Sequence, residues 1–201
     1  MSGPLILSSG LTVLIDPAVP ESYLAMAPTL RLIEDLSLLP TWLPIRSSLP
    51  KASARANETP YQARRRRARE QYAARERERY FGGLQENAVG DANLGRAALL
   101  WCAEHGDPAA FCSTLLPRIW VGGEAFVDAV PAVLNQQGIA AGFEVFAAGA
   151  APQQDALDAE ITELGLYRGP AYVVNGETFQ GREHLPLIYW RLSGEVGSPP
   201  L

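Results

Sequence analysis

The sequence predicts a mixed α/β fold in which a long helical segment interrupts a small sheet. Three observations predict it. A strand, a helix and a second strand follow one another at the start, residues 57–147 have the character of helices, and the last quarter contains a helix, a hairpin and a final helix. With 201 residues and 47% hydrophobic content, the chain can bury the core of one elaborated domain.

The opening segment predicts a buried strand over residues 11–15, because Thr, Val and Ile are concentrated there and Asp16 with Pro17 follows. Pro20 suits the first position of a helix, where its missing N–H has no partner in any case. A second strand is expected over residues 41–45. Pro40 and Pro44 predict that it is either an edge strand or an irregular one.

The first helix shows an irregular apolar stripe, which we expect to face the core. Pro28 is expected to bend or divide this helix. The stripe consists of Tyr23, Leu24, Ala27, Leu30 and Ile33 or Glu34.

The insertion is expected over residues 57–147, leaving residues 1–56 and 148–201 to form the α/β domain. Helix start signals recur along it, the clearest being the capping box of Thr59 and Gln62. Asp91 and Asp107 are expected to cap two further helices. A last helix is expected to have Pro131 near its start.

The closing segment predicts a helix opened by Pro152, then strands over residues 171–174 and 177–180 joined by Asn175 and Gly176, a strong hairpin signal. A final helix follows. Its expected inward face is Leu185, Ile188, Tyr189 and Leu192.

Charge and hydropathy exclude several classes of protein. A net charge of -5 argues against a nucleic-acid binder. The Arg64 to Arg67 run is interleaved downstream with glutamates, which favours a solvated helix face over a nucleic-acid or phosphate site. No apolar run reaches the ~20 residues of a membrane helix. The amino terminus lacks the pattern of a signal peptide, so a cytoplasmic location is expected.

Few side chains suggest chemistry on their own. Cys102 and Cys112 lack the spacing of a redox or metal pair and lie on apolar helix faces, so we interpret them as core residues. His105 and His184 have no Cys or acidic partner at ligand spacing. No catalytic triad, phosphate loop or metal cluster is evident, so the sequence predicts no metal.

Two segments, IDPAVPESYLA and GLYRGPAYVVNGETFQGREHL, resemble the signature segments of the DsbA-like family of the oxidoreductase superfamily. The resemblance is greatest to its branch of 2-hydroxychromene-2-carboxylate isomerases and kappa-class glutathione transferases. It implies a thioredoxin-like fold with an inserted helical domain over nearly the whole chain.

The resemblance places the reactive position of the family at Val19, where the first helix begins. Dithiol oxidoreductases have cysteine at both ends of the segment from Val19 to Ser22, and the isomerase and transferase branch has serine or a similar residue first. Valine supplies neither, so dithiol oxidoreductase activity is not expected. Pro20 would line the site. Ser22 either bonds a nearby backbone group or turns its hydroxyl toward a ligand.

The resemblance also implies a cis peptide before Pro170, packed beside the helix start, with the Gly169 backbone free to pair with a peptide or glutathione. Glu183 corresponds to an acidic position that meets the ligand's amino group, or it is a carboxylate favoured by a helix start. Lys51 and Asn57 are further candidates for the ligand's carboxylate.

Two functions remain open on this reasoning. One is a glutathione-dependent isomerase or transferase acting on a small-molecule substrate, in which glutathione supplies the nucleophilic sulfur. The alternative is a non-catalytic thioredoxin-fold module that binds a peptide or small molecule. The expected partner is a small-molecule substrate or a thiol peptide. Homodimers are common in the branch, so a dimer is an expectation, while nucleic acid and membrane partners are not expected.

Overall fold

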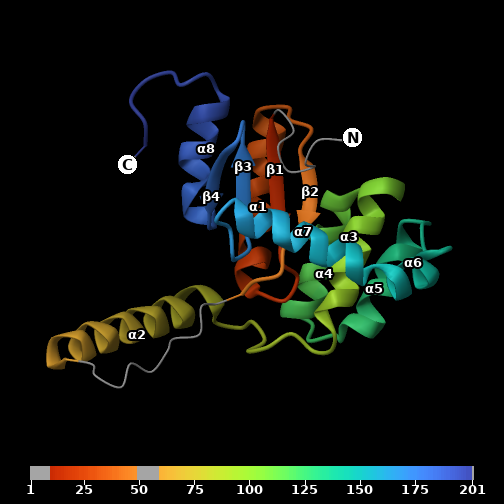
Figure 1. The fold of residues 1–201 in the computed structure, drawn as a ribbon, viewed down its shortest axis with the longest axis horizontal. Coiled ribbons are helices and arrows are strands. Elements are labelled where there is room, and N and C mark those ends of the chain that lie inside the picture. Colours follow the sequence, from red (N-terminus) through yellow and green to blue (C-terminus); the bar gives the residue numbers. More distant parts are fainter. Residues whose placement is uncertain (1–9, 49–58, 201) are drawn as a thin grey trace. The chain divides into compact units, whose positions relative to one another are not determined.

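The computed structural model describes residues 10–48 and 59–200. The strands and helices follow the order β, α, β, six helices, β, β and a closing helical segment (Figure 1). They are β1 (Leu11–Ile15), α1 (Pro20–Asp35), β2 (Thr41–Pro44), α2 (Pro60–Phe81), α3 (Ala92–His105), α4 (Pro108–Trp120), α5 (Phe126–Gln136), α6 (Phe143–Gly149), α7 (Ala151–Glu163), β3 (Ala171–Val174), β4 (Glu177–Gln180), the 3-10 turn η2 (Arg182–His184) and α8 (Leu185–Leu192).

The chain divides into two compact units, residues 49–84 and the remainder. The larger unit contains the sheet together with α3 to α7, so these helices belong to the same compact body as the strands. The insertion boundaries at residues 57 and 147 remain a prediction.

The sheet has the order β2-β1-β3-β4, with β1 and β2 parallel and the other neighbours antiparallel. All five residues of β1 are buried, as expected for a central strand covered on both faces. The second strand lies at the edge, as its prolines predicted.

Different helices cover the two faces of the sheet. On one face, Leu14 and Val173 share a core with Leu100 of α3 and Leu157 of α7. On the other face, the Tyr172 hydroxyl hydrogen-bonds to Thr29 of α1 at 2.8 Å. The sheet is therefore a middle layer between helices. The short segment after β1 leads from the end of that strand directly into α1.

The expected inward face of α1 is wrong. The helix continues undivided through Pro28, and its buried residues are Ser22, Ala25, Met26, Thr29 and Leu32. Two of these carry hydroxyls. Each forms a hydrogen bond, Ser22 with the Asp16 N–H and Thr29 with the Tyr172 hydroxyl, and an apolar pattern cannot reveal such bonds.

Two expectations for later helices are also wrong in detail. Pro131 lies inside α5 and not near its start, because α5 begins at Phe126, whose N–H donates to the Val89 carbonyl. In α8, Leu185 and Ile188 are buried but Tyr189 is 40% exposed, since only a narrow stripe of this short helix faces the core. The helix α6 was not predicted; it begins after Gly142, which has a left-handed conformation with φ 87°.

Candidate functional site

Strand topology brings the expected site segments to one end of the sheet, where β1 and β4 end and β3 begins. This end is called the site edge below. Leu14 near the end of β1 pairs with Ala171 at the start of β3, and Ala171 pairs with Gln180 at the end of β4. The Gly181 N–H donates to the Pro170 carbonyl at 2.9 Å. The start of α1, the peptide before β3 and the turn after β4 therefore all lie at this edge.

The start of α1 has no side-chain cap. Val19 occupies the N-cap position in extended conformation, with Pro20 first in the helix, and its side chain accepts no hydrogen bond. Val19 is partly exposed. Pro20 has no N–H and the Ser22 N–H donates to the Val19 carbonyl at 3.1 Å, so this helix start offers an anion the Glu21 N–H and the positive end of the helix dipole.

Ser22 is fully buried, and its Oγ accepts a hydrogen bond from the Asp16 N–H at 3.1 Å. This contact matches the first of the two alternatives for Ser22, a bond to a nearby backbone group. Its hydroxyl ties the start of α1 to the end of β1.

The peptide between Gly169 and Pro170 is cis. A Cβ atom at Gly169 would lie 2.8 Å from the Asp16 nitrogen and 2.9 Å from Ile45 Cγ2, so only glycine fits between these segments. The Gly169 N–H donates to Ser47 Oγ at 3.0 Å. The resemblance implied that the Gly169 backbone is free to pair with a ligand, but its N–H is occupied and the residue is buried.

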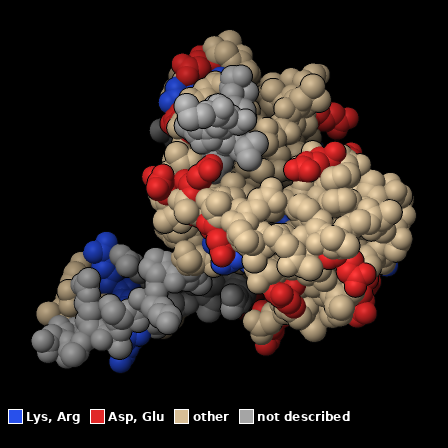
Figure 2. Space-filling view, turned by 45° about the vertical axis from the view of Figure 1, so that its right-hand side comes forward, with Lys and Arg blue, Asp and Glu red and all other residues tan. Residues whose placement is uncertain are grey.

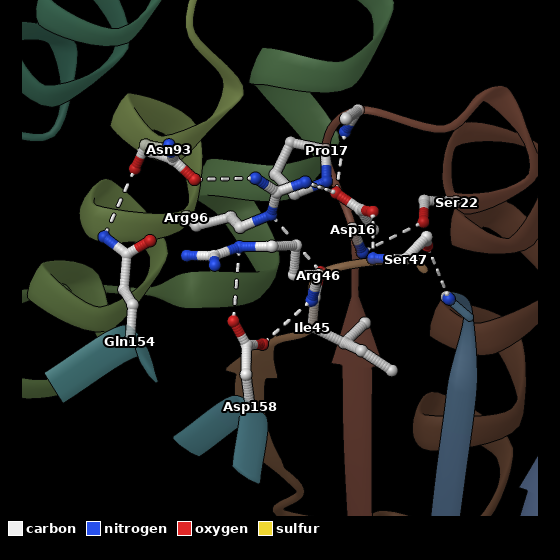
Figure 3. A network of polar contacts seen from close by, with 12 residues as sticks. Asp16, Pro17, Ser22, Ile45, Arg46, Ser47, Asn93, Arg96, Gln154 and Asp158 are labelled. Atoms are coloured by element: carbon white, nitrogen blue, oxygen red, sulfur yellow. Dashed lines mark hydrogen bonds and ion pairs between the residues drawn. The ribbon is translucent and has the colours of Figure 1, made fainter. Parts of the chain in front are cut away.

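Asp16 is the centre of a buried polar network at this edge, which the sequence analysis did not detect (Figure 3). Its Oδ1 accepts from the Ala18 N–H at 3.0 Å and from Arg96 Nη2 at 2.7 Å. Its Oδ2 accepts from the Ser47 N–H at 2.8 Å. One carboxylate therefore positions the loop before Val19 and the residue that holds Gly169.

Arg96 connects this network to the helical part of the larger unit. The Asp16 and Arg96 side chains are 1% and 9% exposed, so they form a buried ion pair. The Arg96 guanidinium also donates from Nη1 to Asn93 Oδ1 at 2.9 Å and from Nε to the Ile45 carbonyl at 3.4 Å. Such a pair fixes orientation, because each of the three Arg96 nitrogens donates to a partner and both Asp16 oxygens accept. A polar Asp directly after a buried strand was the only sequence signal for it.

A second ion pair lies beside the site. Arg168, next to the cis peptide, donates from Nη2 to Glu21 Oε1 at 2.7 Å, and Glu21 is in the first turn of α1. The two side chains are 41% and 28% exposed. A guanidinium that is already partly exposed can also bind the carboxylate of a ligand at this helix start.

Glu183 is exposed in η2, and its carboxylate lies over Gly181, which has φ 104°. The turn packs against α1 and α8. Burial raises the pKa of Tyr172 to about 12, with a smaller contribution from the negative charge of Glu183. Glu183 therefore lies on the α1 side of the sheet, and its contact with a ligand remains a proposal.

The remaining candidates lie elsewhere or outside the description. Lys51 and Asn57 are outside the described residues. Cys102 and Cys112 are buried, as predicted; burial raises the pKa of the Cys102 thiol to about 12 and raises that of Cys112 as well. Over residues 10–48 and 59–200, no group of His, Cys, Asp and Glu has the arrangement of a metal site. Among the described helices, none is long and apolar enough to span a membrane.

No protein-family model and no curated protein matches the sequence significantly. Solved structures do match. A 2-hydroxychromene-2-carboxylate isomerase is 17% identical with a TM-score of 0.65, over 94% of this chain and 99% of that chain. The cytosolic disulfide reductase DsbM of Pseudomonas aeruginosa, solved with glutathione, is 18% identical with a TM-score of 0.57, over 92% of this chain and 98% of that chain. At these identities the likeness concerns the fold, and the chain therefore has the thioredoxin-like α/β fold of DsbA-type proteins.

Proposed function

We propose that the chain binds glutathione or a similar thiol at the start of α1 and acts as a thiol-dependent isomerase or transferase. The observation that carries the proposal is the partly exposed, uncapped start of α1 at the same sheet edge as the cis peptide before Pro170. Bound glutathione would supply a nucleophilic sulfur, which the chain lacks there.

The chain's own residues suit two parts of such a ligand. The positive end of the α1 dipole, together with the Glu21 N–H, favours a thiolate. Arg168 offers a charge for a carboxylate. The network around Asp16 holds the loop of Val19 and the Gly169 peptide in fixed relation, so these groups are positioned before a ligand arrives.

Two observations favour the alternative, a non-catalytic module for a peptide or small molecule. Val19 cannot hydrogen-bond a sulfur, and the Gly169 N–H is already paired with Ser47. Both weaken the binding of glutathione without removing the helix dipole at the start of α1. The thiol-dependent enzyme requires that glutathione binds there, whereas the binding module does not.

Calorimetric titration with reduced glutathione tests the proposal. Wild type should bind weakly, and Val19→Ser should bind about ten-fold more tightly or better, because a hydrogen bond to a charged group contributes ~1.5–3 kcal/mol. The matched control is Val145→Ser, the same change at an 82% exposed valine of α6, which should leave affinity unchanged.

S-methylglutathione separates sulfur recognition from binding of the rest of the ligand. It should bind Val19→Ser no better than wild type, since the methylated sulfur cannot form a thiolate. If wild type and Val19→Ser both show no heat with millimolar-range glutathione, the thiol-dependent enzyme is excluded and the binding module takes its place.

A further inference from the structure

Two ion pairs lie near the start of α1, and they differ in how far water reaches them. The side chains of Asp16 and Arg96 are 1% and 9% exposed and have further hydrogen-bond partners around them (Figure 3). Those of Glu21 and Arg168 are 28% and 41% exposed, and a single contact of 2.7 Å joins Arg168 Nη2 to Glu21 Oε1. The buried pair belongs to the framework, whereas this outer pair can exchange partners, because a partly exposed ion pair contributes little to stability.

The backbone that carries the outer pair is held in place. The carbonyl of Tyr167, directly before Arg168, accepts from the Ser48 N–H at 2.8 Å. The N–H of Gly169, directly after it, is bonded as well. Glu21 lies in the first turn of α1. The two side chains are therefore the parts that can move, and rotation about their own bonds separates them without disturbing a strand or a helix.

The outer pair belongs to an acidic part of the chain. The larger unit has seven basic and 18 acidic residues. Red carboxylates are spread over its visible face in Figure 2. Such a surface repels an anionic ligand except where a cation faces it. Arg168 offers a cation two residues before the start of β3, and Glu21 is the carboxylate that pairs with it.

We propose that Glu21 is a specificity-determining residue of the thiol site, because its carboxylate holds Arg168 until a carboxylate of the ligand takes its place. The ligand class that this contact selects is a thiol that also carries a carboxylate. Two carboxylates at one guanidinium repel each other, so Glu21 turns toward solvent when the ligand binds. Glu21 therefore competes with the ligand and lowers its affinity. This inference rests on the proposed function, since it concerns the same site.

Comparing glutathione with its diethyl ester isolates the carboxylate contact, because the diester keeps the thiol but has no free carboxylate. The indole N–H of Trp120 donates to the Pro17 carbonyl at 3.1 Å, so its NMR signal reports on the segment before Val19. Titrations followed by this signal at about 0.15 M salt give both affinities, and their ratio is the measured quantity. Glu21→Gln should raise the ratio of glutathione to diester affinity about three- to five-fold, the range of an exposed ion pair.

A second variant separates competition from general repulsion between Glu21 and an anionic ligand. Arg168→Gln should lower the ratio, because the cation for the ligand carboxylate is gone. Adding Glu21→Gln to Arg168→Gln should change the ratio less than two-fold, since no guanidinium remains to compete for. The matched control is Glu177→Gln, which removes the acid of a partly exposed pair with Arg191 at the opposite end of β4 and should leave the ratio unchanged.

The outcomes distinguish this inference from the proposed function. If Glu21→Gln leaves the ratio unchanged, or raises it equally in the presence of Arg168→Gln, the competition is refuted while the thiol site stands. If neither the wild type nor Val19→Ser binds glutathione or the diester, the thiol site itself is refuted, and the inference with it.

Discussion

Replacing Arg96 by methionine is expected to destabilise the larger unit by about 3–5 kcal/mol, because it leaves a buried carboxylate without its cation. The Asp16 side chain is 1% exposed and lies 2.7 Å from Arg96 Nη2. Methionine also removes the donor to the Ile45 carbonyl. The Ala18 and Ser47 N–H groups remain, which places the expected loss toward the lower end of the range.

Urea unfolding followed by tryptophan fluorescence measures this effect, at about 0.5 M salt so that exposed ion pairs are screened. The matched control is Arg118→Met, whose exposed ion pair with Glu124 should contribute less than about 1 kcal/mol. Equal losses in the two variants would contradict the assignment of Asp16 and Arg96 as a buried, fully paired group.

A double-mutant cycle sharpens the same argument. Asp16→Asn alone should also destabilise, since both carboxylate oxygens accept from N–H groups and an amide would turn an NH2 toward one of these donors. Asp16→Asn combined with Arg96→Met should cost less than the sum of the single changes, because the unpaired charge is gone. Additive losses would mean that the two side chains are not energetically coupled.

Three further outcomes follow from the larger unit. Cys102 and Cys112 should not react with a thiol reagent in the folded protein but should both react in urea. The reason is that burial raises the pKa of Cys102 to about 12 and raises the pKa of Cys112 as well. For the same reason, the protein should not reduce insulin. Gly169→Ala should lower the urea midpoint of unfolding, because the added Cβ would lie 2.8 Å from the Asp16 backbone nitrogen. Gly149→Ala should not, because no atom lies within 4 Å of the added Cβ. The folded pKa of Tyr172, about 12, lies above its unfolded value of ~10, so its contribution to stability is complete below that value and is lost as pH rises toward 12; absorbance titration at high pH checks this.

Local backbone chemistry explains what the sequence alone determined. The capping box of Thr59 and Gln62 and the Asp107 cap form as predicted, because each involves groups within three residues of one another. The hairpin turns at Asn175 and Gly176 as predicted, both with positive φ, and joins β3 to β4 with Val174 paired to Glu177. The cis peptide between Gly169 and Pro170 was expected because its segment resembles a signature segment of the DsbA-like family. The strand and the turn in that segment are also local features.

Tertiary structure decided the parts of the site that join distant segments. Asp16 and Arg96 are 80 residues apart, and nothing at either position in sequence indicates that they meet. The Gly169 N–H donates to Ser47, which is 122 positions away. A buried polar group is stable only where a partner is brought to it, so its role depends on how the strands, α1 and α3 pack together.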